Sequence, residues 1–403
     1  MTSSSSEGER VSRSTGLWLV AGAFAATTIG GALPTPLYPE YQRRFGFGPL
    51  TVTVIFAMYA VGVLAALLVV GRASDSIGRR PVLFGGLAAS ATSSVVFLIV
   101  GGMHSGGVPL LYLARLLSGV SAGVFAGTAT AALADLAGPQ RRRRASVVAA
   151  VANIGGLGSG PLLCGLLARY VPGPLQTVYV VHLALVLIGA VAVLASPEPV
   201  EMEGPRRWQF QRLSLPPGRR AVFLEAGAVS FAGFALLGMF TSVSPAVLAL
   251  LHHHNPALTG LVVFVVFAAS TIAQIASSRL PRNLVFLTGT AGLIVGLGLV
   301  GASLAASSLG LLVAGGIVGG AAQGVSFRAA LEFVTEMSPP DQRSAVASSF
   351  FALSYVGLSL PVVGIGAGTR AYGLVHTGEV FTAVLGTITL VAMTRTAIRL
   401  RGH

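Results

Sequence analysis

Two carboxylates in this sequence stand inside apolar segments, where they could bind and release a proton. Glu225 follows closely after Arg219 and Arg220, and Glu332 follows Arg328 by four residues. A carboxylate near a helix N-terminus is stabilised by the helix dipole, and an acid and a base four residues apart pair on one helix face. Each carboxylate therefore has two interpretations, as a proton carrier or as part of a structural ion pair.

Arg115 is a second kind of candidate, because it is a charge within the apolar run 109–137. Arg115 follows the start of that run by six residues, which places it about 9 Å from this end if the run is an α-helix. A charge at such a depth in a bilayer costs roughly 2.5–3.5 kcal/mol on insertion scales, so such residues are functional candidates by default. The alternative is a guanidinium that reaches the polar boundary or donates to backbone carbonyls.

The sequence contains no arrangement typical of an enzyme. It has neither a nucleophile next to a base nor a spacing typical of metal ligands. The tract HHHN at 252–255 is expected in a solvated loop, and Cys164 is the only cysteine, which excludes an internal disulfide. We therefore expect no catalytic activity, no bound metal and no cofactor.

The composition indicates what kind of element must hold these residues. The chain has 403 residues, of which 53% are hydrophobic and 10% are charged, and its mean hydropathy is +0.80. Soluble domains carry roughly 25% charged residues, so the sequence predicts an integral membrane protein. Arginine supplies all the positive side chains behind the net charge of +13. Because the arginines lie between apolar runs, nucleic acid is not an expected partner.

Twelve apolar runs are long enough to cross a bilayer as helices, which takes about 20 residues each. Twelve crossings place both ends of the chain on the same side. Most arginines lie in the connections of that side, and Arg43, Arg44, Arg169 and Arg370 lie in the others, so the positive-inside rule predicts cytoplasmic termini. The expected spans are 15–36, 50–71, 82–102, 109–137, 144–170, 175–196, 221–250, 257–278, 284–305, 309–336, 344–368 and 378–398.

The longest polar connection divides the twelve helices into six and six. ALADLAGPQRRRRASVV at 132–148 is similar to EFVTEMSPPDQRSAVAS at 332–348, with Asp135 in the place of Glu336. This offset indicates a duplication, and duplicated halves around a central cavity are typical of membrane transporters. The expected fold is all-α, with two pseudo-symmetric six-helix bundles. Its expected parts are a disordered cytoplasmic tail 1–14, an N-terminal bundle 15–196, a cytoplasmic linker 197–219 and a C-terminal bundle 220–403 with a short cytoplasmic tail.

One short connection resembles a family signature. GRASDSIGRRPV at 71–82 is similar to G-x-L-x-D-R-x-G-R-[RK], the loop signature of the major facilitator superfamily, although Ala73 and Ser76 depart from it. The resemblance implies that this loop helps to close the cytoplasmic side by pairing with helix ends of the opposite half. A topology signal combined with a tight turn is the alternative. The residues assigned to this gate are Gly71, Asp75, Gly78, Arg79, Arg80, Asp135 and Glu336.

Two further stretches resemble signatures of the same superfamily. In LYLARLLSGVSAG, Arg115 is followed four residues later by Gly119, and the resemblance links this arginine to proton coupling. GLGSGPLLCG is similar to G-x-x-x-G-P-x-x-G-G of the drug–proton antiporters, with Cys164 in place of one glycine. Ordinary close packing of helices is the alternative for these small residues. The matching positions are Gly156, Gly160, Pro161 and Gly165.

The resemblance also implies a central cavity lined mainly by helices 1, 4, 7 and 10. The candidate lining residues are mostly apolar with few polar groups, which suits an amphipathic or lipophilic ligand better than a sugar. Each aromatic side chain could equally serve core packing. The candidates are Thr27, Thr28, Tyr59, Asn153, Phe231, Phe234, Phe240, Gln323 and Tyr355.

Together these resemblances predict a transporter that exports amphipathic small molecules in exchange for protons. The expected partners are the small-molecule substrate, protons and membrane lipid. The expected form is a monomer in the plasma membrane of a bacterium, driven by the proton gradient without a cofactor. The first helix carries no acid before Glu40, unlike several drug antiporters, so an uncoupled carrier stays open. Two further functions also stay open, namely a facilitator or proton symporter of a sugar, amino acid or other metabolite, and a membrane enzyme or receptor on the same scaffold.

Overall fold

The computed structural model describes residues 12–70, 74, 77–198, 213–216, 218–277, 282–339 and 342–401. Over these residues, twelve helices are long and apolar enough to cross a membrane. This confirms the predicted fold class and the predicted number of spans. Gly71 and Asp75 of the predicted gate lie outside the described residues, as does most of the 197–219 connection.

The first half of the chain contains six of these spans. The first span combines α1 (Arg13–Ala32), a 3₁₀ turn (Thr35–Leu37) and α2 (Tyr38–Phe45). The fifth combines α7 (Arg142–Ala150), a π-helical segment (Val151–Gly155) and α8 (Gly156–Tyr170). The others are the single helices α3 (Pro49–Val70), α5 (Arg79–Gly102), α6 (Val108–Ala137) and α9 (Pro174–Ala195).

The second half contains the other six spans, and most predicted limits agree with the observed ones within a few residues. The largest difference is the first span, predicted to end at residue 36. Pro36 and Pro39 each stand in the first turn of a new helical segment there, a place that accepts proline, so the chain stays helical to Phe45. The six helices are α10 (Arg220–Leu250), α11 (Pro256–Ala276), α12 (Arg282–Ala305), α13 (Leu309–Glu336), α14 (Arg343–Tyr372) and α15 (Leu374–Arg401).

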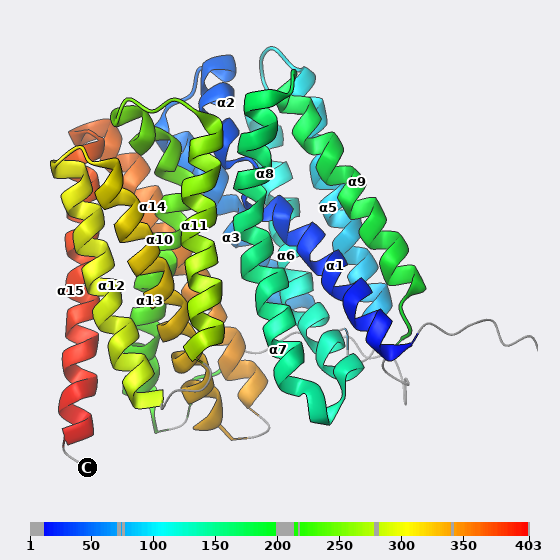
Figure 1. Cartoon of the computed structure of the whole chain (residues 1–403), viewed down its shortest axis with the longest axis vertical. Coiled ribbons are helices and arrows are strands. Elements are labelled where there is room, and N and C mark those ends of the chain that lie inside the picture. The colour runs from blue at the N-terminus through cyan, green and yellow to red at the C-terminus, as the bar shows by residue number, and fades with distance from the viewer. Residues whose placement is uncertain are drawn as a thin grey trace, which may run out of the picture.

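Equivalent helix pairs pack together in the two halves, which lie side by side (Figure 1). In the first half α1 packs on α6, α8 and α9. In the second half α10 packs on α13, α14 and α15, the helices at the same places in the repeat. Between the halves, α3 packs on α14 and α8 packs on α11. We call these two contacts between the halves the seams. Each helix of one seam has its repeat equivalent in the other seam, as expected for a duplicated six-helix unit.

Glycines let helix backbones approach closely within a half. A Cβ at Gly62 of α3 would lie closer than 3.0 Å to the backbone oxygen of Leu116, and one at Gly119 of α6 would crowd the backbone oxygen of Tyr59 in the same way. Helices in lipid associate through such close packing, because lipid supplies no hydrophobic force between them. Gly119 therefore holds α6 against α3.

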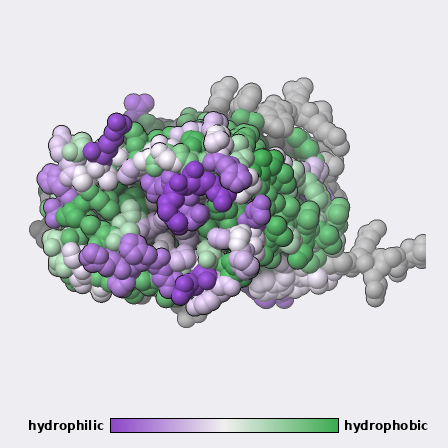
Figure 2. Space-filling model, turned by 90° about the horizontal axis from the view of Figure 1, so that it is seen from above, coloured by the Kyte–Doolittle hydropathy of each residue, from purple (hydrophilic) through white to green (hydrophobic). Residues whose placement is uncertain are grey.

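The start of α1 and the end of α15 lie at the same face of the molecule, which is the lower one in Figure 1. We call it the arginine-rich face, because its helix ends carry Arg13, Arg141–Arg144, Arg219, Arg220 and Arg399. The opposite face carries α2 and the connection 252–255. Figure 2 views that face from above and shows hydrophilic residues gathered on it, with hydrophobic residues beside them.

Candidate functional site

Arg115 of α6 is completely buried and has no carboxylate partner among the described residues. Its Nη1 donates to the backbone oxygen of Gly31 in α1 at 2.5 Å. Its guanidinium lies 4.8 Å from the centre of the Tyr59 ring and 5.5 Å from that of Phe56. Its Nε and Nη2 have no hydrogen-bond partner. Arg115 thus donates to a backbone carbonyl, as one interpretation of its sequence predicted, but it uses only Nη1 to do so.

The surroundings of Arg115 are aromatic rather than acidic. A ring face attracts a desolvated guanidinium by about 2 kcal/mol, but a buried charge with unused donors stays unfavourable. The Tyr38 hydroxyl is also buried without a partner, and it interacts electrostatically with Arg115. This site can therefore accept a water molecule, an anion or a substrate oxygen without first breaking an ion pair.

A cluster of aromatic side chains crosses from one half to the other. Phe234 of α10 lies 5.1 Å from Phe327 of α13 and 5.9 Å from Tyr355 of α14, measured between ring centres. Tyr59 of α3 belongs to the same apolar cluster, and Phe231 and Tyr355 pack against it. Four predicted cavity residues thus lie in or against one apolar cluster that includes side chains of both halves, and we call them the aromatic junction: Tyr59, Phe231, Phe234 and Tyr355.

Three other predicted cavity residues are bound within one half. Thr28 donates to the backbone oxygen of Ala152 at 2.7 Å, which fastens α1 to the π-helical segment, and Thr27 donates to backbone oxygens of its own helix. Phe240 is fully buried between α10 and α13, with its ring beside Gly316. These three side chains therefore bond or pack within their own half.

Two predicted polar residues keep unused hydrogen-bonding groups. Gln323 of α13 accepts from Ser270 Oγ at 2.7 Å through its Oε1, whereas its Nε2 is buried without a partner. Asn153 lies half-buried in the π-helical segment, and its side chain forms no hydrogen bond with a described residue. Because π-helical segments are frequent at functional sites, Asn153 is a candidate for ligand contact, and the unused Nε2 makes Gln323 a second one.

Glu225 forms an ion pair with a residue that the sequence did not indicate. Its Oε1 lies 2.5 Å from Nη2 of Arg399, and its Oε2 accepts from Thr396 Oγ1 at 3.2 Å. The expected neighbours, Arg219 and Arg220, precede it by six and five residues and so lie on other sides of the helix. With both oxygens engaged by α15, Glu225 has the geometry of a structural ion pair.

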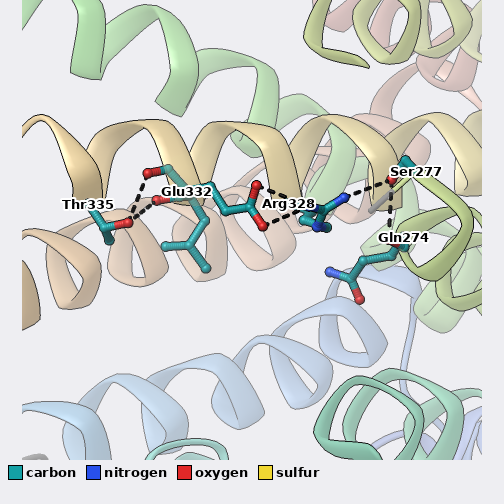
Figure 3. Close-up of polar contacts among 6 residues, drawn as sticks. Gln274, Ser277, Arg328, Glu332 and Thr335 are labelled. Carbon is teal, nitrogen blue, oxygen red and sulfur yellow. Dashed lines mark hydrogen bonds and ion pairs between the residues drawn. The ribbon is translucent and has the colours of Figure 1, made fainter. Parts of the chain in front are cut away.

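Glu332 pairs with Arg328 on α13, one of its two predicted interpretations (Figure 3). Nη2 of Arg328 lies 2.8 and 3.1 Å from the two carboxylate oxygens, and Nη1 donates to Ser277, which follows the last residue of α11, at 3.5 Å. The Glu332 side chain is 39% exposed, against 9% for Glu225, so it is the more accessible carboxylate. Gln274 of α11 lies beside this group with its Oε1 buried and without a partner, and no sequence pattern marks it.

Arg79 and Arg80 begin α5 at the arginine-rich face. They follow Gly78, whose φ of 101° favours glycine. Their backbone N–H groups donate to the two carboxylate oxygens of Glu198 at 3.0 and 2.9 Å. Glu198 therefore caps α5 at the end where a helix stabilises an anion. No sequence pattern marks Glu198, because a capping side chain more than a hundred residues away leaves no local signal.

The guanidinium groups of these two arginines also bind residues of the first half. Nε of Arg79 pairs with Asp135 at 3.2 Å, and Arg80 donates to the backbone oxygen of Leu194 at 2.5 Å. Asp135 thus meets an arginine as predicted, but one of its own half. Glu336, its counterpart in the repeat, lies exposed at the end of α13.

The glycines of the predicted antiporter signature hold α8 against α1 and α11. Side chains at Gly156 and Gly160 would collide with Thr28 and with the backbone of Ile29 in α1. A side chain at Gly165 would collide with the backbone of Pro256 at the start of α11. Gly165 therefore lies at one of the two seams between the halves, whereas Gly156 and Gly160 pack within the first half.

Further close contacts join the halves near the opposite face. Thr35 Oγ1 donates to the backbone oxygen of Thr241 at 2.6 Å. On the other seam, a side chain at Gly366 of α14 would collide with Thr53 of α3. These contacts hold the halves together at the end away from the arginine-rich face.

His182 is a buried polar residue that no sequence motif marked. Its Nε2 lies 3.1 Å from the backbone oxygen of Ala26, and its Nδ1 lies 2.8 Å from Ser94 Oγ. Because a carbonyl only accepts, Nε2 donates to it, and His182 ties α9 to α1. Among the residues that the structure describes, no group of His, Cys, Asp or Glu side chains is arranged to hold a metal ion.

The family is decided by a match along most of the chain. The family model of the Major Facilitator Superfamily matches residues 19–362. The chain belongs to the Major Facilitator Superfamily. It is thus a multi-pass membrane transporter, and the resemblance carried by residues 71–82 is confirmed.

Solved structures of superfamily transporters share the fold. The human organic anion transporter MFSD10 (TETRAN) superposes with a TM-score of 0.70 at 17% identity, over 95% of this chain and 99% of that one. A bacterial homologue of the human lysosomal transporter Spinster gives a TM-score of 0.68 at 15% identity, over 96% of this chain and 98% of that one. At these identities the likeness concerns the fold alone.

Curated relatives in the superfamily match over shorter stretches. The cephamycin export protein CmcT of Amycolatopsis lactamdurans is 29% identical over 68% of this chain and 53% of its own length. A triacylglyceride transporter of Mycobacterium tuberculosis is 35% identical over 33% of this chain and 23% of its own. Multidrug resistance protein 2 of Bacillus subtilis is 28% identical over 35% of this chain and 34% of its own.

Proposed function

We propose that this superfamily member exports amphipathic or lipophilic small molecules across the plasma membrane of a bacterium, in exchange for protons. The observation that carries export is the antiporter signature of α8, of which Gly165 packs directly on α11 of the other half. The bacterial relatives named for cephamycin export and multidrug resistance support the same direction. The arginine-rich face would be cytoplasmic by the positive-inside rule, with both termini on that side.

The aromatic junction supports a lipophilic substrate. Tyr59, Phe234 and Tyr355 supply aromatic side chains from both halves, and Asn153 and Gln323 have side-chain groups without a hydrogen-bond partner among the described residues. Pockets that are mostly apolar with a few polar groups suit amphipathic ligands, whereas a sugar needs many partners. A substrate held by both halves would be carried from one side to the other as the halves rock.

Rocking requires a set of contacts that can open. Thr35 and Thr241 bond across the halves near the opposite face, and they must separate when that side admits or releases substrate. The α3–α14 and α8–α11 seams then act as the hinges between two rigid bundles. This division of roles is what alternating access by duplicated halves needs.

Glu332 is the carboxylate that we propose as the proton carrier. It is more exposed than Glu225, and a single ion pair with Arg328 holds its two oxygens. A proton driven by about 100 mV supplies about 2.3 kcal/mol, which supports roughly a 50-fold concentration ratio. The unused donors of Arg115 offer a second charged site that could respond to the same cycle.

The test uses purified protein in liposomes with an imposed pH gradient and a dye that reports internal pH. Lipophilic cations, neutral antibiotics, sugars and amino acids are added in turn. We expect a lipophilic compound to trigger proton flux opposite to its own movement, and Glu332→Gln to abolish that flux. Glu225→Gln is the matched control and should keep it. Movement of sugars or amino acids instead, or transport that ignores the gradient, would refute proton-coupled export.

A further inference from the structure

An apolar groove runs between α1, the fifth span and α11, outside the aromatic junction. Its volume is about 760 Å³, and residues from all three segments line it, including Ala25, Val151, Phe264 and Ile272. Val151 and Ile272 are 47% and 66% exposed, so this groove opens to the surroundings of the helices, which in a membrane are acyl chains. None of the predicted substrate residues lines it.

A basic cavity adjoins the groove at the arginine-rich face. Its volume is about 440 Å³, and it is lined by Arg13 of α1 and by Arg141 and Arg144 near the start of the fifth span. Among the residues that the structure describes, no carboxylate lines it and none pairs with these three arginines. Three guanidinium groups at the end of membrane-spanning helices suit the phosphate of a lipid headgroup.

Trp18 connects the two cavities, because its side chain lines both. It is half exposed, and the Arg144 guanidinium lies 5.5 Å from its ring centre. Indole rings are enriched where headgroups meet acyl chains. The order along the protein is therefore arginines, indole and apolar groove, which matches the order of phosphate, ester region and acyl chain in a phospholipid.

We propose that an anionic phospholipid of the leaflet at the arginine-rich face binds here, with its phosphate on Arg13 and Arg141 and one acyl chain in the groove. The positive charge of the cavity favours an anionic lipid, because the headgroup of a zwitterionic lipid carries a cation that the arginines would repel. The acyl chain in the groove contacts α1 of one half and α11 of the other. Binding of the lipid therefore favours the conformation of the protein in which this groove exists. This binding is independent of transport direction and of the transported compound.

Trp18 reports this binding directly. The chain contains two tryptophans, Trp18 and Trp208, so Trp208→Phe leaves one indole in the full-length protein. That protein is placed in phosphatidylcholine vesicles with increasing fractions of dibrominated phosphatidylglycerol or dibrominated phosphatidylcholine, whose bromine atoms quench fluorescence on contact. We expect the brominated phosphatidylglycerol to quench Trp18 at a several-fold lower fraction than the brominated phosphatidylcholine.

Two sets of variants test the two parts of the site. Arg13→Gln with Arg141→Gln should remove most of this several-fold preference, while Arg144 stays to keep the surroundings of Trp18. Gly22→Leu should fill the groove and reduce quenching with the charges intact, because nothing lies within 4 Å of a Cβ at that position. Arg370→Gln at the opposite face is the matched charge control and should change nothing.

Four results would overturn the proposal. Equal quenching by the two brominated lipids would make the groove an ordinary lipid contact. A preference that survives loss of Arg13 and Arg141, or full quenching in Gly22→Leu, would place the lipid elsewhere. A preference that appears only after residues 2–11 are removed would assign the basic cavity to that segment, which contains Glu7 and Glu9.

Discussion

The Arg115 guanidinium lies 4.8 Å from the centre of the Tyr59 ring, in the buried interior where α6 crosses α3. The ring takes the place that a carboxylate would hold beside a buried arginine. In this protein the first helix has no acid to fill that role and supplies only the backbone oxygen of Gly31. Tyr59 therefore stabilises the folded protein through a cation–π contact with the buried Arg115 guanidinium.

Tyr59→Leu should lower the free energy of unfolding by about 2 kcal/mol, because Arg115 loses its nearer ring and leucine offers no π face. Tyr59→Phe keeps the ring and should stay close to the parent protein. Thermal unfolding in detergent, followed by circular dichroism, measures both. Equal destabilisation by the two variants would mean that the hydroxyl of Tyr59, not its ring, supports the arginine.

Gly160→Ala should destabilise the protein by about 1–3 kcal/mol, the usual range for overpacking, and should reduce transport. The added methyl group would press on the backbone of Ile29, which cannot turn away as a side chain can. Gly127→Ala on α6 is the matched control, since nothing lies within 4 Å of a Cβ there. The measurement is the melting temperature of the two variants, which should be lower for Gly160→Ala than for Gly127→Ala. Similar melting temperatures would show that α1 and α8 can move apart to accommodate the methyl group.

The pair of Glu225 and Arg399 should show a coupling energy of roughly 1 kcal/mol in a double-mutant cycle, with the exposure of Arg399 keeping it modest. The cycle compares Glu225→Gln, Arg399→Gln and their combination by chemical unfolding. Because the pair joins α10 to α15, each single change should destabilise the second half. Additive single changes would mean that the two side chains do not interact in the membrane.

Thr35→Val should favour opening of the face that carries α2, because it removes the hydrogen bond to Thr241 while keeping the size of the side chain. One hydrogen bond is worth about 1 kcal/mol, or about fivefold in the ratio of the two conformations. Cysteines at Arg43 and His254, which line one cavity between the halves at that face, can be cross-linked in a Cys164→Ser background. We expect slower cross-linking in the Thr35→Val protein, and an unchanged rate would contradict the role of this bond.

The spans were predictable because hydropathy and span length are local properties of a membrane helix. The number of helices, their limits and the Arg328–Glu332 pair all follow from such short-range patterns. The partner of Glu225 was not predictable, since Arg399 lies 174 residues further along the chain. The cap by Glu198 and the burial of Phe240 also depend on which helix faces come together, and hydropathy alone does not specify that in lipid.

The two seams between the halves have an evolutionary consequence. Because α3–α14 and α8–α11 are images of one another under the repeat, a single duplication of a six-helix unit creates both seams at once. Afterwards each copy can diverge alone, and here α8 carries the glycine-rich signature while α14 has Leu358, Ser359 and Leu360 before Pro361. The two seams can therefore come to differ in how closely their helices pack, although one duplication produced both.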